Sequence, residues 1–256
     1  MIGLLKKLNT MKQIRKRENL CIYEVFGVYI RVNFGKGNHM TNQDLFKNHG
    51  FCIIKNAISN DVRDIITQYA LFDEMQNYNP EGDTGGICVP NAHSKYADPV
   101  MESVLLHLQE SIEENVGFKV DPTYSYYRVY RKGDDLKPHQ DRPSCEISAT
   151  LCFNYDYDDK KYQWPIYMDG TPVVLSPGDL VIYRGCDLPH WREEFNCEEN
   201  NWHVQGFFHY IDQNGPHTSH KFDGRETIGI SETNESTSTT QPQTPIPNEK
   251  SYIQWS

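Results

Sequence analysis

The sequence predicts a mainly β fold with supporting α-helices, of the sandwich or jelly-roll type. The second half of the chain breaks into short runs rich in Tyr, Val, Ile and Phe, which Gly, Pro and Asp turns separate. The chain contains 16 Tyr and 11 Phe, and aromatic and β-branched residues favour strands. Strands this short, at this turn spacing, are typical of a sandwich or jelly roll and not of a parallel sheet.

Two helices are predicted in the first half of the chain. The run FCIIKN at 51–56 is a short predicted strand, and Ser59 after it caps a helix with apolar residues at helical spacing. The Asp98-Pro99 pair opens a second helix, which Gly117 ends.

The rest of the domain is predicted as strands joined by turns. The hairpin among them turns at Asp169-Gly170, a pair that suits a two-residue turn. In chain order the predicted strands are YSYYRVY at 124–130, EISATLCFNYD at 146–156, the hairpin WPIYMDGTPVVL at 164–175, LVIYRG at 180–185 and NWHVQGFFHYID at 201–212.

We expect a single domain over residues 40–230, with its core at 124–212. Residues 1–39 are a poorly defined N-terminal extension in which the apolar-rich run at 22–32 predicts a peripheral strand. This extension starts with a basic segment that makes a poor secretory signal. We expect it to be dispensable, upstream of a start at Met11 or Met40, and an organelle transit peptide is the alternative. Residues 231–256, rich in Ser, Thr, Pro and Gln, predict a disordered tail.

The composition argues against several classes of protein. A net charge of −10 opposes general nucleic-acid binding, which needs a basic face. Seven Cys without a CxxC pair argue against a disulfide framework or zinc ribbon and favour a reducing, cytoplasmic location. No stretch has the apolar length of a membrane span, so no membrane partner is expected. The oligomeric state is not predicted.

A candidate metal site begins in the polar stretch KPHQDRPSC at 137–145. His139 and Asp141 are two residues apart, so on a strand they point to the same side. The third candidate ligand is His190, which follows a Pro-Gly-Asp turn and a buried strand. Two His and one carboxylate on one face of an octahedron leave three positions open, as in non-haem Fe(II) enzymes that activate oxygen. Zinc would more often take Cys or a third His.

Other residues of metal-binding type have simpler interpretations. The spacing of the later histidines fits neither one strand face nor a helix pair, so we expect them at the surface or at an edge. They are His209, His217 and His220. Three cysteines near the site in sequence are expected to be small core residues. They are Cys145, Cys152 and Cys186. Lys132 with Asp134 and Asp135 predicts a solvated turn.

The order strand, His-x-Asp, strand, hairpin, Pro-Gly-Asp strand, distal His and closing strand resembles an Fe(II)/2-oxoglutarate-dependent dioxygenase. The resemblance covers roughly residues 124–212, and YRVYRKGDDLKPHQD at 127–141 is similar to the approach to the iron motif in the prolyl-hydroxylase-like branch. It implies a double-stranded β-helix, a cupin-like jelly roll. It also implies Fe(II), 2-oxoglutarate and O2 as cofactors, with ascorbate as a further candidate, and hydroxylation of a C–H bond with release of succinate and CO2.

The resemblance also implies cosubstrate contacts. Family members usually place Lys or Arg early on the strand after the distal His to bind the second carboxylate of 2-oxoglutarate, but here His203 takes that place. Arg192 is the alternative cation, because its fork suits a carboxylate. Arg142 is the third choice and is equally well a substrate contact. Tyr130 matches the family tyrosine that bonds the cosubstrate, and Asn154 is a further polar contact.

These assignments have structural alternatives. His203 is as well explained as a buried histidine with satisfied hydrogen bonds, Tyr130 as a packing residue, and Arg192 as an ion-pair partner of a neighbouring glutamate.

The leading functional hypothesis is therefore an oxygenase acting on a peptidyl side chain, proline first, with a free amino acid or small metabolite as the other substrate class. The loops at 77–91 and 154–164 are predicted to form the rim of a substrate groove. A nucleobase demethylase is disfavoured, because the chain is acidic and has no basic aromatic groove. The alternatives are a non-catalytic metal-binding jelly-roll module and a zinc hydrolase on a cupin-like barrel.

Overall fold

The computed structural model describes residues 20–25, 28–33, 40–79, 89, 92–230, 244–245 and 253–254. The chain divides into two compact units, Met1–Thr41 and Asn42–Ser256. In the first unit, β1 (Leu20–Val25) and β2 (Val28–Asn33) pair as an antiparallel hairpin, so the apolar run at 22–32 contributes to both strands. The other predictions for residues 1–39 lie outside the described residues, as do most of those for residues 231–256.

The second unit carries the predicted helices and strands in the predicted order, together with elements that were not predicted, among them α2, β4, η2, η3, β13 and β14. Its elements follow in chain order. They are α2 (Asn42–His49), β3 (Phe51–Ile54), α3 (Asn60–Asn77), β4 (His93–Tyr96), α4 (Pro99–Val116), β5 (Val120–Tyr130), β6 (Leu136–Gln140), η2 (Pro143–Cys145), β7 (Ile147–Asp156), β8 (Ile166–Met168), β9 (Thr171–Val173), β10 (Leu180–Arg184), β11 (His190–Arg192), β12 (Trp202–Asp212), η3 (Thr218–Gly224), β13 (Thr244–Pro245) and β14 (Ile253–Gln254).

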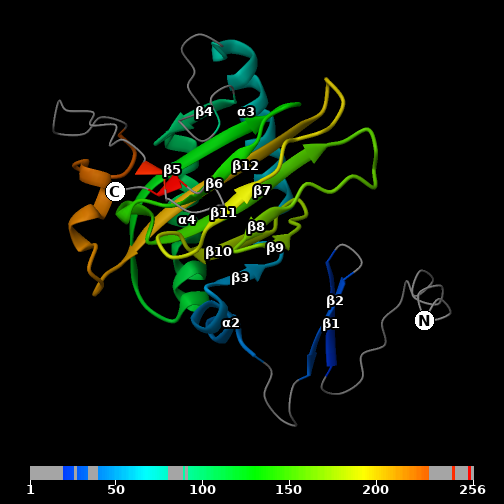
Figure 1. The fold of residues 1–256 in the computed structure, drawn as a ribbon. Coiled ribbons are helices and arrows are strands. Elements are labelled where there is room, and N and C mark those ends of the chain that lie inside the picture. Colours follow the sequence, from blue (N-terminus) through cyan, green and yellow to red (C-terminus); the bar gives the residue numbers. More distant parts are fainter. Residues whose placement is uncertain are drawn as a thin grey trace. The chain divides into compact units, whose positions relative to one another are not determined.

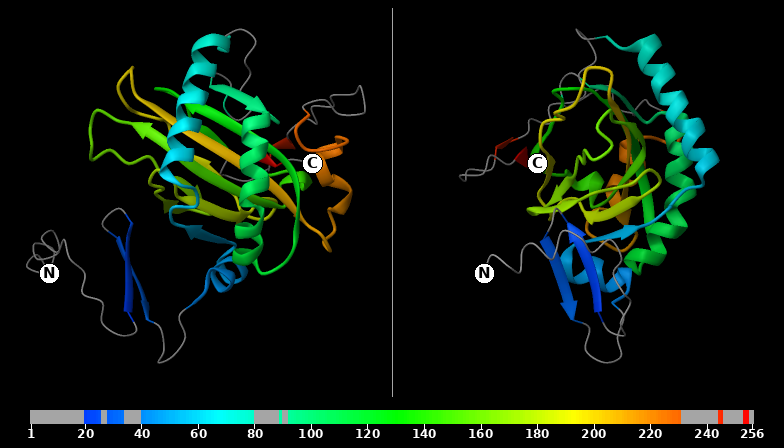
Figure 2. Two further views of the ribbon diagram at one scale, coloured as in Figure 1. Left: turned by 180° about the vertical axis from the view of Figure 1, so that it is seen from behind. Right: turned by 90° about the vertical axis from the view of Figure 1, so that its right-hand side faces the viewer.

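These strands form two sheets (Figure 1). The larger sheet has the order β3-β10-β7-β12-β5-β4, and its pairs are all antiparallel. The smaller sheet has the order β13-β14-β6-β11-β8-β9. The helices α3 and α4 lie along one face of the larger sheet, and the smaller sheet lies on the other side (Figure 2). The mainly β jelly-roll class predicted from the sequence is confirmed.

The helix signals act as predicted. The Ser59 hydroxyl accepts a hydrogen bond from the Val62 amide at the start of α3. Asp98 accepts bonds from the first amides of α4, and Gly117 ends that helix at a φ of 89°. Each of these caps satisfies amide or carbonyl groups that a helix end otherwise leaves unpaired, which is typically worth about 1 kcal/mol.

The side chains of the larger sheet alternate between two environments. One face packs on α3 and α4 in the main hydrophobic core, which contains Leu105 and Phe208. The other face points between the sheets, and on β7 and β12 it carries a row of polar and aromatic side chains. That row consists of Ser148, Thr150, Cys152, His203, Gln205, Phe207 and His209. The alternation places one strand face in the apolar core and reserves the other for a site between the sheets.

The predicted hairpin is confirmed. β8 pairs with β9, and Asp169 and Gly170 have φ angles of 45° and 82°, the left-handed values that a type I′ turn requires.

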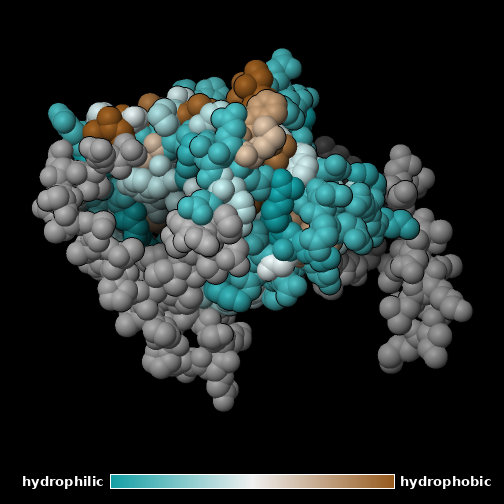
Figure 3. Space-filling model, turned by 90° about the horizontal axis from the view of Figure 1, so that it is seen from above, coloured by the Kyte–Doolittle hydropathy of each residue, from teal (hydrophilic) through white to brown (hydrophobic). Residues whose placement is uncertain are grey.

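No helix in the described part of the chain is long and apolar enough to cross a membrane. Figure 3 shows a mostly hydrophilic surface on which apolar side chains gather in a few places. Among the described residues, the most exposed large apolar side chains are Ile65 and Met75 on α3, at 70% and 74%.

The prediction of a solvated turn after β5 is wrong for one residue. Lys132 is exposed, but Asp134 is 9% exposed because it folds back to accept a hydrogen bond from the Arg131 amide. Burial raises the pKa of the Asp134 carboxyl to about 6.

A folded-state pKa raised above the unfolded value means that the folded chain binds the proton more tightly. Stability is therefore lost as the pH rises through the window between about 4 and 6. We expect Asp134→Asn, which keeps an acceptor and removes the charge, to raise the free energy of unfolding at pH 7.5 by about 2 kcal/mol and to leave it little changed at pH 4. Urea unfolding at both pH values measures this, with Asp159→Asn on an exposed loop as the control. An equal effect at both pH values would contradict the assignment.

Candidate active site

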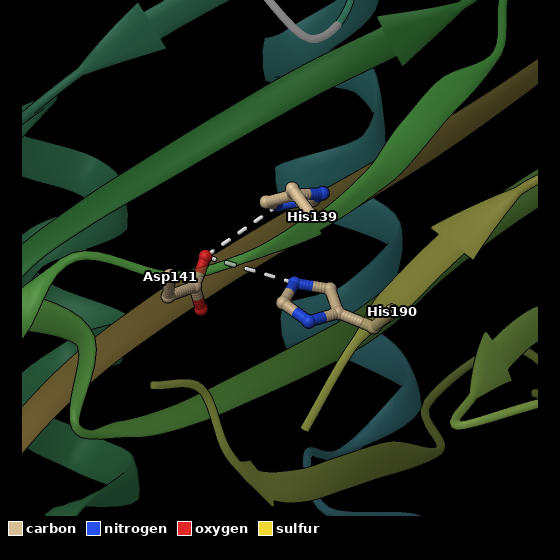
Figure 4. Close-up of side chains that lie close together, drawn as sticks. All are labelled: His139, Asp141 and His190. Atoms are coloured by element: carbon tan, nitrogen blue, oxygen red, sulfur yellow. Dashed lines mark ion pairs between the residues drawn. The ribbon is translucent and has the colours of Figure 1, made fainter. Parts of the chain in front are cut away.

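Three buried side chains meet at the seam of β6 and β11 (Figure 4). His139 lies directly opposite His190 in the antiparallel pairing of these two strands, and Asp141 follows the end of β6. The Asp141 Oδ1 atom is 3.5 Å from His139 Nε2 and 3.6 Å from His190 Nε2. The three residues predicted as metal ligands are thus brought together from two neighbouring strands.

The two imidazoles are oriented by backbone carbonyls. His139 Nδ1 lies 2.7 Å from the Lys137 carbonyl oxygen, and His190 Nδ1 lies 2.9 Å from that of Leu188. Because a carbonyl can only accept, each Nδ1 carries the proton and each Nε2 presents a lone pair towards Asp141. Burial, together with the neighbouring His139 ring, lowers the pKa of His190 to about 4, so the His190 ring is neutral at ordinary pH.

This donor set fits a divalent metal ion. Ligand atoms about 2.1 Å from an ion and at right angles to one another lie about 3 Å apart, close to the spacing seen here. Two neutral imidazoles and one carboxylate are the facial set that suits Fe(II) and leaves positions open.

Asp141 is held as a carboxylate in a fixed orientation. Its amide donates to the Gly185 carbonyl at 2.9 Å, and its Oδ2 accepts from the Ser148 hydroxyl at 2.7 Å. Burial alone raises the pKa of the Asp141 carboxyl, but the rings of His190 and His139 hold that pKa well below its usual range. The charge that a metal needs is therefore present before the metal binds.

Gly185, in the turn after β10, makes room for this carboxylate. A Cβ atom at this position would lie 2.2 Å from the Cys145 carbonyl oxygen, 2.5 Å from Asp141 Oδ2 and 2.6 Å from Ser148 Oγ. Backbone and ligand thus approach more closely than any side chain allows. From the sequence, Gly185 is expected only as the end of the strand at 180–185, with no role in the site.

The triad opens onto a cavity of about 140 Å³ between the sheets. Besides the triad, its lining residues are Tyr124, Tyr126, Arg128, Leu136, Arg142, Cys145, Tyr183, Phe207 and His209. Most of these lining residues were not predicted from the sequence. The alternation in YSYYRVY, which puts Tyr124, Tyr126 and Arg128 on one face of β5, was the available signal.

The prediction of a surface position for His209 is wrong. It is 6% exposed and lines the cavity, because β12 continues as one strand through this residue and turns its alternate side chains inward. His217 and His220 are half-buried and lie outside this lining. Arg142 does line the cavity, and its guanidinium is paired with both oxygens of Asp223 at 2.6 Å.

The residues predicted to bind the cosubstrate form a second buried group around Trp164 and do not line this cavity. The Arg192 guanidinium lies 4.4 Å from the Trp164 ring and donates to the Trp164 carbonyl and to Gln205 Oε1, both at 2.6 Å. The Tyr130 ring centre is 4.9 Å from that of Trp164, and the His203 ring centre is 5.3 Å from it. Arg192 therefore points inward and not towards a neighbouring glutamate.

Several polar atoms of this group are buried without a hydrogen-bond partner. They are Tyr130 Oη, Arg192 Nε, His203 Nε2 and Gln205 Nε2. Burial and the charge of Arg192 hold the pKa of His203 well below its ordinary value, and its Nδ1 is 2.7 Å from the Tyr157 hydroxyl. His203 is thus neutral, and Arg192 is the cation of the group. Asn154 is half-buried, and its Oδ1 accepts from the Tyr155 amide.

No protein-family model matches the sequence, and no curated protein matches it. The chain is similar in structure to SnoN, a non-haem α-ketoglutarate-dependent epimerase from nogalamycin biosynthesis, with a TM-score of 0.55 and 10% identity over 81% of this chain and 94% of that one. It is similar to a Trichoplax adhaerens prolyl hydroxylase in complex with a hypoxia inducible factor peptide fragment, with a TM-score of 0.52 and 14% identity over 68% and 88% of the two chains.

A 2OG-Fe(II) oxygenase family oxidoreductase from Burkholderia pseudomallei is also similar, with a TM-score of 0.52 and 14% identity over 72% and 96% of the two chains. At this identity the likenesses concern the fold. The second unit has the double-stranded β-helix fold of the 2-oxoglutarate/Fe(II) oxygenases, as the sequence resemblance implied.

Gly185→Ala tests how the carboxylate is positioned. The added methyl group would occupy the space of Asp141 Oδ2, so we expect Co(II) affinity to fall at least 10-fold while the fold is kept. Co(II) titration monitored by visible absorbance, with circular dichroism for folding, measures this. Gly133→Ala is the control for a glycine-to-alanine change without a steric clash, since nothing lies within 4 Å of its added Cβ. Unchanged affinity in Gly185→Ala would contradict the tight packing described here.

Proposed function

We propose that this protein is an Fe(II)- and 2-oxoglutarate-dependent oxygenase that hydroxylates a C–H bond of a peptidyl side chain, with proline as the first candidate. The observation that carries the proposal is the buried facial set of His139, Asp141 and His190, which opens onto a cavity inside this fold. Fe(II) is the ion that this donor set suits best.

In this proposal, groups of the protein itself would bind the metal ion and orient its ligands. The two Nε2 atoms and Asp141 Oδ1 hold the metal, while the carbonyls of Lys137 and Leu188 keep both rings aligned. Bound iron and 2-oxoglutarate supply the oxidising chemistry, in which O2 is consumed, succinate and CO2 leave, and a hydroxyl group is added to the substrate. The aromatic lining of the cavity limits the access of water to this centre.

We assign the distal carboxylate of 2-oxoglutarate to Arg192. It is 2% exposed, and among the described residues its contacts are with Trp164 and Gln205 and with no carboxylate. A buried guanidinium without a counter-charge is costly unless a ligand supplies one. His190 and Arg192 both point inward from β11, so one strand would present the metal and the cation to the two ends of the same dicarboxylate. His203 and Tyr130 then serve as neutral hydrogen-bond partners.

A peptide substrate is supported by the Trichoplax adhaerens hydroxylase, which is in complex with a peptide fragment. SnoN shares the fold and is an epimerase, so the fold alone does not select the reaction. Of the two loops predicted as a groove rim, 77–91 lies mostly outside the described residues. In the loop at 154–164, Tyr157 is buried against Phe195, which anchors the loop beside the barrel.

A second candidate function is a non-catalytic metal-binding module. It is favoured by the separation of the two sites, because the triad lines the 140 Å³ cavity and the Arg192 group does not. In a module of this kind the protein would bind the metal without responding to 2-oxoglutarate.

Anaerobic titration with Fe(II) and 2-oxoglutarate separates the two functions. For the oxygenase we expect a weak visible charge-transfer band that requires both components and is lost in Asp141→Ala, because removing the carboxylate removes the metal. Asp135→Ala, beside the site in sequence and outside the triad, is the matched control and should keep the band. Iron binding without a band in the wild type would support the module and contradict the oxygenase.

The position of the cosubstrate gives a further prediction. We expect Arg192→Gln to raise the 2-oxoglutarate concentration for half-maximal band intensity by about 10- to 100-fold, since a charge-assisted contact is lost. Arg128→Gln, which changes an arginine that lines the metal cavity beside Arg142, should have a much smaller effect. The reverse ranking of the two variants would move the distal carboxylate to Arg128.

A further inference from the structure

His209 lies beside the triad without being one of its ligands. It points from β12 into the cavity, where the Tyr124 ring lies against it with a centre-to-centre distance of 4.5 Å and an interplanar angle of 35°. Burial lowers the pKa of His209 to about 4, so the ring is neutral and carries a single N–H. Where that proton resides follows from the neighbouring hydroxyl.

Ser148 links His209 to the ligand Asp141. The Ser148 Oγ atom is 2.7 Å from Asp141 Oδ2 and 3.0 Å from His209 Nδ1. A hydroxyl has one proton, and a carboxylate is the stronger acceptor than the Cys145 carbonyl at 3.1 Å. Ser148 therefore donates to Asp141 and accepts from His209, which places the imidazole proton on Nδ1.

We propose that His209 is a positioning residue which, through Ser148, holds Asp141 Oδ2 away from the metal so that the carboxylate binds through Oδ1 alone. The inference rests on the metal site of the proposed function and concerns its geometry. A carboxylate that is free to rotate can bind a metal through both oxygens and would occupy one of the positions that a cosubstrate needs. The hydrogen bonds from His209 to Ser148 and from Ser148 to Asp141 remove that freedom. The contact with Tyr124 holds the His209 ring in place.

The same residues allow a competing arrangement. Asp141, Cys145 and His209 have ligand-type atoms within 4.8 Å of one another and can form a second cation site. Two observations oppose it. The Cys145 sulfur lies 3.1 Å from the Tyr124 hydroxyl and is engaged by it. Asp141 Oδ2 and His209 Nδ1 are both already engaged by Ser148.

Co(II) binding to the purified full-length chain tests the inference without requiring turnover. His209→Phe keeps a ring against Tyr124 but removes the donor, whereas His209→Asn keeps an N–H group near the Nδ1 position. We expect His209→Phe and Ser148→Ala to weaken Co(II) binding about 10- to 100-fold and to change the visible Co(II) spectrum. His209→Asn should keep the wild-type spectrum. The double variant His209→Phe/Ser148→Ala should bind Co(II) no more weakly than Ser148→Ala alone, because the two residues act in series.

Two results would overturn the inference and leave the metal site intact. One is a folded His209→Phe protein with wild-type Co(II) affinity and spectrum. The other is a second equivalent of bound Co(II) with a thiolate charge-transfer band that Cys145→Ala removes, since His209 would then be a ligand. Undiminished Co(II) binding in Asp141→Ala would instead overturn the proposed metal site itself, and the inference with it.

Discussion

Burial of the Asp141 carboxylate between two imidazoles is the interaction on which the architecture of the site depends. A carboxylate without compensating contacts is expensive to remove from water. Here the backbone amide donates to Gly185, Ser148 donates to Oδ2, and two histidines face Oδ1. Ser148 and the backbone orient the group, and a cation bound between Oδ1 and the two Nε2 lone pairs would balance its charge.

The sheet topology provides the framework for this centre. The direct opposition of His139 and His190 fixes two ligands across one strand pair, so neither depends on a flexible loop. Pro138 is tolerated in β6 because the pairing is irregular here: on β11, His190 pairs with His139 and Arg192 with Leu136, and the pairs with β14 begin at His139. The helices cover only the opposite face of the larger sheet, which leaves the space between the sheets for polar chemistry.

Much of the fold and the His-x-Asp part of the site could be predicted from the sequence, because the sequence signals for them are local. The caps at Ser59 and Asp98, the Asp169-Gly170 turn and the His-x-Asp spacing each act within a few residues. The role of His209 could not be predicted, since it depends on the facing of a long strand whose register with β7 and β5 shifts at bulges. The burial of Asp134 and the inward direction of Arg192 likewise depend on tertiary packing, and charged residues are expected at the surface by default.

Arg192 shows how these constraints bear on function. The sequence resemblance implied a cation on the closing strand β12, where this chain has His203. The structure instead has the buried Arg192 on β11, the preceding strand in the chain. Stacking on Trp164 and two hydrogen bonds hold the guanidinium in place but do not neutralise it. A buried charge of this kind is the feature of the fold that most clearly calls for an anionic ligand.

A crystal structure of the Mn(II)-loaded protein, with anomalous data that locate the ion, tests the central claim most directly. The account predicts a single anomalous peak bonded to His139 Nε2, His190 Nε2 and one oxygen of Asp141, with Asp141 Oδ2 still bound to Ser148. A peak among Asp141, Cys145 and His209, or a carboxylate bound through both oxygens, would contradict it.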